Sequence, residues 1–289
     1  IVPTIKEIMS HPFPVLFGEE PTSKVKKPKD TVSHRGKTND FVYQLTIKEQ
    51  SQLLDYLNLS AELFAPITSS GEVSHPLQKM NLMVNIPYIA QKNKLIEKTQ
   101  LEIDIDQSVD KCLLRAFSEL PTKHGKMPLE LVCNGDDNQL DVNVNWIINR
   151  KETFKGQVNM STLFSKGEDG TLVTDLTISP SNLVFNDSVW TIQRAHIHCA
   201  QNNIVVDNFD VRHADQFINI KGKASPLPED ELCIDLKNLN LDYIFQTLEI
   251  NNALLGGDAT GTLYASQLFS KSPVAFTNDL KVKNISYNG

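Results

Sequence analysis

No apolar run in this sequence approaches the roughly 20 residues that a membrane-spanning helix needs, and basic residues are not in excess. The 28 Lys and Arg residues stand against 35 Asp and Glu residues, which gives a formal net charge of −7. A net acidic chain is poorly suited to binding nucleic acid or anionic lipid headgroups. We therefore expect no transmembrane helix and no nucleic-acid partner within these 289 residues.

Cysteine is scarce, and its spacing does not fit a metal site. The four cysteines, Cys112, Cys133, Cys199 and Cys233, form no C-x-x-C pair, whereas zinc sites usually show paired ligands at short spacing. Each cysteine lies close to apolar residues in the sequence. We therefore expect small buried hydrophobic side chains, and the spacing leaves open whether one disulfide forms.

Catalytic signatures are also missing. The sequence has no G-x-S-x-G, no H-E-x-x-H, no phosphate-binding glycine loop and no dinucleotide fingerprint. His196 and His198 are the only closely paired histidines, and we expect them on one solvated strand face. Asp104 and Asp106 fall on a predicted polar face, whereas an acid/base pair needs one desolvated member. The sequence therefore predicts no enzyme activity, no cofactor and no metal.

What the sequence does have is two-residue alternation over most of its length, which is typical of β-strands. Leu140, Val142, Val144, Trp146 and Ile148 alternate with polar or outward-facing positions in the clearest run. Turn signals between the runs predict antiparallel neighbours, so we expect an all-β fold whose sheet contacts solvent on one side. Similar runs are Phe41–Ile47, Leu82–Ile86, Leu101–Ile105, Leu172–Ile178, Ile204–Val206, Phe209–Val211, Ile218–Ile220, Leu232–Leu236 and Leu280–Val282.

Helical patterns are few. Apolar spacing predicts a short helix in Glu49–Leu57 and one or two helical turns in Tyr243–Leu248. Val109–Leu120 fits either a helix or a strand, and we favour a strand because Met127–Cys133 follows as a hairpin partner.

The first 40 residues differ in character from the rest. We expect an N-terminal strand there, followed by an extended Lys/Pro-rich segment, since the stretch from Pro21 to Asn39 holds six basic residues and one acid. A docking site for an acidic partner or a lipid headgroup is the alternative for that stretch. Residues 41–289 are expected to form one continuous domain. Because the chain opens at Ile1 with neither Met nor a signal-peptide profile, we expect it to be a piece of a longer protein or a processed form.

A weakly repeated unit suggests stacked β architecture. Leu236–Ile244 and the glycine-punctuated Ala253–Ser266 form one copy, and Leu54–Leu57 with Thr68–Ser74 forms a weaker one. These units resemble the repeats of the TamB family, the inner-membrane half of the translocation and assembly module, and of AsmA-like proteins. The resemblance covers roughly residues 40–289, and its motifs are degenerate.

The resemblance implies a fold, a place and a role. The fold is an elongated, curved antiparallel sheet, a taco-like β-groove with an apolar interior. The place is the periplasm of a Gram-negative bacterium, in a protein that bridges both membranes through an inner-membrane anchor outside this chain. The role is phospholipid transport and outer-membrane biogenesis, with phospholipid acyl chains and an outer-membrane β-barrel assembly protein as partners. No catalytic residues are implied.

Two further functions remain alternatives. One is a protein-binding scaffold or chaperone for outer-membrane proteins without lipid cargo, and the other is a β-sandwich module for carbohydrate binding or adhesion. Alternation alone does not separate an open groove from a sandwich. The residues expected to line a lipid groove are Leu140, Val142, Val144, Trp146, Ile148, Leu172, Leu176, Ile178, Ile218, Ile220, Leu263, Leu280 and Val282.

Overall fold

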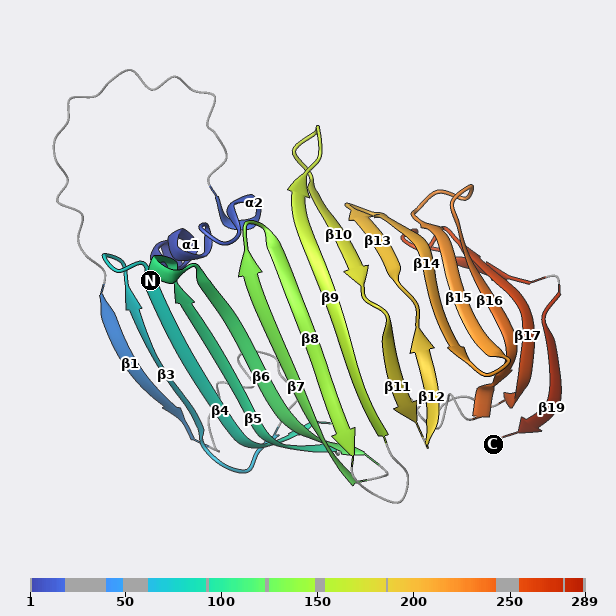
Figure 1. Ribbon diagram of the computed structural model, residues 1–289, viewed down its shortest axis with the longest axis horizontal. Coiled ribbons are helices and arrows are strands. Elements are labelled where there is room, and N and C mark those ends of the chain that lie inside the picture. Colours follow the sequence, from blue (N-terminus) through green and yellow to red (C-terminus); the bar gives the residue numbers. More distant parts are fainter. Residues whose placement is uncertain are drawn as a thin grey trace. The chain divides into compact units, whose positions relative to one another are not determined.

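The computed structural model describes residues 2–18, 40–48, 62–91, 94–122, 125–148, 154–185, 187–242, 255–277 and 279–287. Most of them lie in strands, and the strand pairings are antiparallel, which confirms the all-β prediction (Figure 1). The chain forms two compact units, Ile1–Val144 and Asn145–Gly289, rather than the one continuous domain expected after residue 40. The helices predicted in Glu49–Leu57 and Tyr243–Leu248 lie outside the described residues.

The N-terminal unit is a meander in which β1, β3, β4, β5, β6 and β7 pair in that order, with β2 beside the far end of β4. The strands are β1 (Phe41–Ile47), β2 (Glu62–Leu63), β3 (Ile67–Ser74), β4 (Lys79–Gln91), β5 (Lys94–Asp106), β6 (Lys111–Thr122), β7 (Gly125–Asp136) and β8 (Gln139–Ile148), the last of which runs across the unit boundary.

Two predictions for this unit are confirmed. The ambiguous stretch from residue 109 forms β6, after a short 3₁₀ turn at Gln107–Val109, and pairs with β7 in a regular register. Asp137 and Asn138, which connect β7 to β8, have φ values of 43° and 63°. Two successive residues with positive φ are typical of the tight hairpin turn that the sequence Asn134-Gly-Asp-Asp-Asn138 predicts.

The expected N-terminal strand is wrong, because the described residues 2–18 form helix α1 (Val2–Met9) and the single turn α2 (Pro14–Phe17). Ile5, Ile8 and Met9 recur at helical spacing, and proline near the start of a helix removes no needed hydrogen bond. Ile8 is fully buried against β3, β4 and β5. Packing of this apolar stripe therefore overrides the strand reading of a short N-terminal segment.

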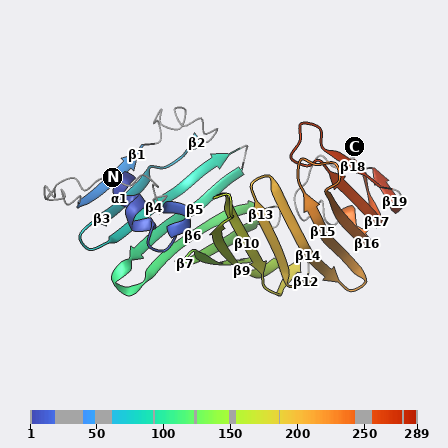
Figure 2. The same cartoon turned by 90° about the horizontal axis from the view of Figure 1, so that it is seen from above.

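The C-terminal unit is also an antiparallel meander. β9 pairs with β10 along one part of its length and with β11 along another. On their other sides, β10 pairs with β13 and β11 pairs with β12. Both β12 and β13 pair with β14, and β15, β16, β17 and β19 follow in that order (Figures 1 and 2). The strands are β9 (Phe154–Lys166), β10 (Leu172–Ile178), β11 (Ser181–Phe185), β12 (Ser188–Ile192), β13 (Ala195–Ala200), β14 (Asn203–His213), β15 (Gln216–Ala224), β16 (Glu231–Asn240), β17 (Leu255–Ser266), β18 (Val274–Phe276) and β19 (Lys281–Tyr287).

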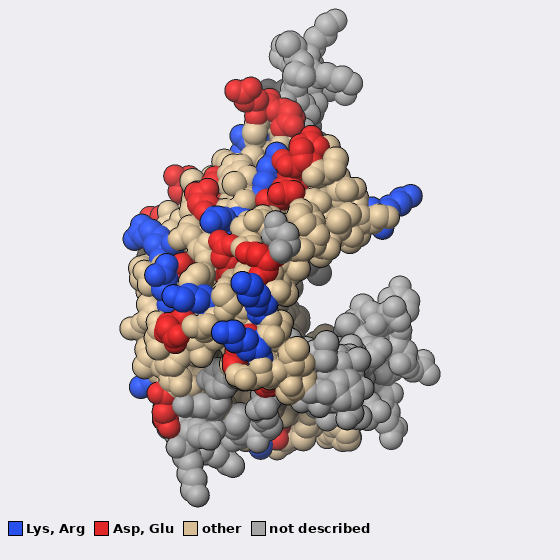
Figure 3. Space-filling model, turned by 90° about the vertical axis from the view of Figure 1, so that its right-hand side faces the viewer, with Lys and Arg blue, Asp and Glu red and all other residues tan. Residues whose placement is uncertain are grey.

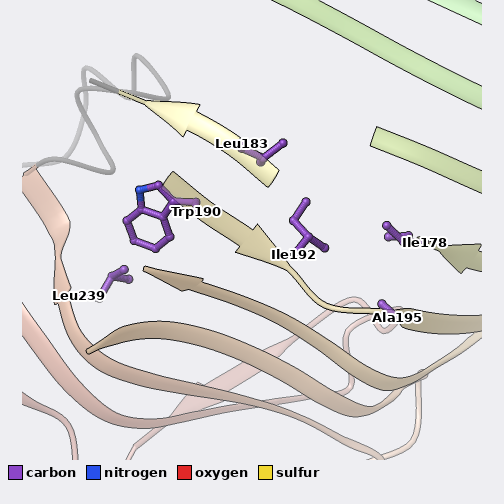
Figure 4. Close-up of a cluster of buried hydrophobic side chains, with 6 residues drawn as sticks. All are labelled: Ile178, Leu183, Trp190, Ile192, Ala195 and Leu239. Carbon is purple, nitrogen blue, oxygen red and sulfur yellow. The ribbon is translucent and has the colours of Figure 1, made fainter. Parts of the chain in front are cut away.

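The sheet of the C-terminal unit is strongly curved. Leu239 of β16 belongs to the same buried cluster as Trp190 of β12, although β14 and β15 lie between these strands (Figure 4). A flat sheet would hold the two side chains about 14 Å apart, at 4.7–4.9 Å per strand. A bulge between Leu236 and Leu239, with Asn238 at a φ of 45°, bends β16 locally.

A glycine makes room for one of the two tryptophans. A Cβ added at Gly156 of β9 would overlap the indole of Trp146, so we expect Gly156→Ala to lower the free energy of unfolding of the C-terminal unit by about 1–3 kcal/mol through overpacking. Urea titration followed by circular dichroism measures this loss. In a Trp146→Leu background the same substitution should cost clearly less, and an equal cost would show that the indole is not the cause.

Candidate functional site

The sheet of the N-terminal unit has one apolar face. Strand register aligns the inward-pointing residues in rows that cross β1, β3, β4, β5, β6 and β7. The N-terminal inner face is defined by two such rows, Tyr43, Gly71, Leu82, Ile103, Leu114 and Cys133, followed by Leu45, Ser69, Val84, Leu101, Ala116 and Leu131. Neither row contains a charged side chain.

Helix α1 covers only the end of this surface. Its residues Ile5, Ile8 and Met9 pack on the preceding row, which includes Val73, Met80, Ile105 and Cys112. Beyond α1 the leucine, isoleucine and valine side chains of the two rows are half-buried, and Leu45 is exposed. Within the described part of this unit, the only helical elements are α1, α2 and the 3₁₀ turn. The N-terminal inner face therefore has apolar surface available for contact.

The opposite face of the same sheet is a charged, solvated surface. Lys79 and Asp106 form an ion pair at 2.6 Å, and Lys111 pairs with Asp104 on the neighbouring strands. The hydrogen bond from Lys79 lowers the pKa of Asp106, and the bond to Asp104 raises the pKa of Lys111. The two rows of the N-terminal inner face carry no charged side chain, whereas these ion pairs lie on the opposite face, so the opposite face is the side of the sheet that is suited to water.

The C-terminal unit repeats this division. Its inner face, the C-terminal inner face, consists of cross-strand neighbours on β10, β13, β14, β15, β16 and β17. They are Leu176, Ile197 and Val206 in one row, Phe209, Ile220, Ile234 and Leu263 in a second, and Val211, Ile218 and Leu236 in a third. On the outer side, Lys221 pairs with Asp235 at 3.2 Å and Lys223 with Asp230 at 3.0 Å. Basic and acidic side chains are interspersed on the face shown in Figure 3.

The structure places most of the predicted groove residues on half-buried positions. Ile148 and Ile178 are instead buried, at 4% and 8% exposure, and Leu172 at a strand end is 46% exposed. Leu280 precedes β19 and lies against Gly261. The ten half-buried residues are Leu140, Val142, Val144, Trp146, Leu176, Ile218, Ile220, Leu263, Leu280 and Val282.

Sequence reasoning missed the N-terminal inner face as a site. The alternation predicts strands at Leu82 and Ile103, but all the predicted groove residues lie at Leu140 or beyond. The same alternation marks both regions, so the signal was present in β4 and β5. What the sequence does not show is that these runs lie side by side in register.

The paired histidines have an acidic neighbour that the sequence hides. Asp175 lies directly opposite His198 across β10 and β13, with Oδ1 at 2.7 Å from His198 Nδ1 and 3.7 Å from His196 Nε2. All three side chains are on the outer face. The described ranges contain no cluster of three or more His, Cys, Asp or Glu side chains arranged to hold a metal ion.

The four cysteines are free thiols rather than disulfide partners in this structure. Cys133 is buried, and the other three are half-buried. Burial raises the pKa of each thiol above its ordinary value, which keeps all four protonated and poorly reactive near neutral pH. Cys112 and Cys133 contribute to the apolar side of the sheet as small hydrophobic residues.

A hollow of about 330 Å³ lies on the N-terminal unit, but its chemistry differs from that of the inner face. Glu102, Arg115 and Glu130 line it together with Met83 and Phe117, and Arg115 pairs with Glu102 at 3.6 Å. Its charged lining belongs to the solvated side of the sheet. The two inner faces therefore remain the candidate site.

No helix within the described residues is both long enough and apolar enough to cross a membrane. Comparison with protein-family models, with curated proteins and with solved structures found no match for this chain.

Proposed function

We propose that this chain shields lipid acyl chains on its apolar inner faces, as a periplasmic part of a TamB-like protein in phospholipid transport and outer-membrane biogenesis. The observation that supports this most is the N-terminal inner face. Its two rows are uncharged and rich in leucine, isoleucine and valine. These side chains are partly exposed, whereas the opposite face of the same sheet carries ion pairs.

Hydrocarbon fits these faces better than a polypeptide does. An extended peptide laid on an apolar face would leave its backbone N–H and C=O groups without partners, and each such group is costly to desolvate. An acyl chain has no such groups, and each buried CH₂ contributes roughly 0.8 kcal/mol. The rows of the N-terminal inner face cross six strands, which at 4.7–4.9 Å per strand spacing is about 24 Å.

The remaining parts of the proposal come from the family resemblance. They are the periplasmic location, the inner-membrane anchor outside this chain and the outer-membrane β-barrel assembly partner. The carbohydrate-binding alternative needs an exposed aromatic platform. Trp190 is 3% exposed and Trp146 packs on Gly156, so the two tryptophans do not supply one.

Two adjacent residues of β4 allow a matched test. Leu82 belongs to the N-terminal inner face, whereas its neighbour Met83 points to the other side and is 51% exposed. We expect a photo-crosslinking benzoylphenylalanine at position 82 to capture phospholipid when the protein is made in a Gram-negative periplasm. At position 83 it should capture none. Mass spectrometry of the crosslinked protein measures both.

Charge substitutions at the same pair give the quantitative form of this test. Leu82→Asp should lower co-purified phospholipid at least about tenfold, because an unpaired carboxylate is costly to bury against hydrocarbon, while Met83→Asp should leave it unchanged. Val144→Asp is the equivalent change at a predicted groove residue of β8. Circular dichroism checks that each variant stays folded. Equal lipid capture at positions 82 and 83, or protein clients in place of lipid, would contradict the proposal.

A further inference from the structure

The sheet of the N-terminal unit has an edge strand without the usual protection against pairing. Within the described part of the chain, β1 pairs on one side only, with β3. Natural edge strands are commonly blunted by lysine, proline or a bulge. β19 of the C-terminal unit follows this rule, with Lys281, Lys283 and a positive φ at Asn284. β1 reads Phe-Val-Tyr-Gln-Leu-Thr-Ile and has none of these features.

The side chains of β1 are complementary to a second copy of the same strand. Antiparallel pairing with Gln44 opposite Gln44 of another copy brings Phe41 opposite Ile47 and Tyr43 opposite Leu45. All four residues have odd numbers, so their side chains point to the same face of β1 and would lie on the same side of the joined sheet. That side is the N-terminal inner face, so its apolar rows would continue from one copy into the other.

The flanking charges fit the same register. Asp40 precedes β1 and Lys48 follows it, four residues on either side of Gln44. In the self-paired arrangement, Asp40 of each copy therefore lies opposite Lys48 of the other, and opposite charges across a strand pair are favourable. Asp40 is held at this edge by hydrogen bonds that its Oδ1 accepts from Ser74 Oγ at 3.0 Å and His75 N at 3.2 Å.

We propose that β1 is a self-recognition edge, through which two copies of this chain pair their sheets about a two-fold axis at Gln44. Three features support a second copy over an unrelated strand: the uncharged edge, the matched apolar face and the symmetric Asp40 and Lys48 flanks. An isologous two-fold contact closes at a dimer and leaves no further β1 edge open. The proposal does not depend on lipid cargo.

Charge at the axis tests the contact. Sedimentation equilibrium of the native chain should show a monomer–dimer equilibrium, and Gln44→Lys should raise the dissociation constant by about three- to tenfold because two like charges then meet. An equimolar mixture of Gln44→Lys and Gln44→Glu should restore dimers. Ser70→Lys is the matched control, since Ser70 is exposed beside Gln44 on β3 but lies away from the edge. It should not change the dissociation constant.

Engineered cysteines test the register. Under mild oxidation Gln44→Cys should form a covalent dimer rapidly. Thr46→Cys should not, because position 46 faces Val42 of the other copy, whereas a mixture of Thr46→Cys and Val42→Cys should crosslink. A chain that stays monomeric at every concentration would overturn the proposal. The proposal would also be overturned if Gln44→Lys left the dissociation constant of the dimer unchanged, or if Ser70→Lys raised it as much as Gln44→Lys does. Equal disulfide crosslinking of Gln44→Cys and Thr46→Cys would overturn it as well.

Discussion

Trp190→Ala is expected to lower the free energy of unfolding of the C-terminal unit by about 3–5 kcal/mol. Trp190 is 3% exposed, faces Leu183 across β11 and β12, and lies in the cluster that joins these strands to Leu239 (Figure 4). Its ring also stacks on His213 at 5.2 Å between centroids. Removing it leaves a cavity in the buried cluster that contains Leu183 and Leu239. Urea unfolding, followed by the fluorescence of the remaining Trp146, measures the loss.

The neighbouring residue provides the control. Val189 precedes Trp190 on β12 and is 50% exposed on the other face. Val189→Ala should change the free energy of unfolding by no more than about 0.5 kcal/mol. Trp190→Phe keeps most of the ring volume and should lose less than the alanine variant. If Val189→Ala destabilised the unit as much as Trp190→Ala, burial of the indole would not be the cause.

Arg212→Ala is expected to lower the stability of the C-terminal unit at neutral pH, because it removes two charge-assisted hydrogen bonds to a buried carboxylate. Asp210 is 4% exposed at its side chain, and Arg212 donates to both of its oxygens, with Nε at 2.5 Å and Nη2 at 2.7 Å. Without the guanidinium, a buried carboxylate keeps only Asn219, at 3.3 Å, as a side-chain donor. Differential scanning calorimetry compares the variant with Arg212→Lys, which keeps the charge and should lose less.

The pH dependence separates this account from simple loss of packing. Hydrogen bonding to Arg212 holds the pKa of Asp210 below its ordinary value of 3.8 in the folded protein. The contribution of the pair is therefore fully present above the ordinary carboxyl pKa, and is lost as pH falls through the lowered folded-state pKa. The stability gap between wild type and Arg212→Ala should then shrink as the pH falls below 4. A gap that stays constant down to pH 2 would mean that packing, not charge, stabilises this position.

Sequence reasoning performed well where the signal is local. The alternation in β7 and the turn signal before β8 predicted that strand and that turn as the structure has them. For β6 the sequence fitted either a helix or a strand, and the hairpin partner that follows it correctly favoured the strand. It failed where the deciding contact is distant. Helix α1 is stabilised by Ile8, which packs with Val73, Met80 and Ile105, residues that lie 65 or more positions further along the chain, and a strand was expected in its place. Asp175 meets His198 through the β10–β13 register, which no sequence spacing shows.

By itself, the sequence determined the all-β class, most of the strands after residue 40 and which of their side chains share a face, because side-chain direction along a strand alternates with a period of two. Only the tertiary structure decided which apolar positions are buried and which stay available. Ile178 and Leu176 lie on the same face of β10. Ile178 is buried within the cluster that contains Trp190, whereas Leu176 packs against that cluster and stays half-buried. Burial depends on the elements that cover a face, and those are set by long-range register and bending.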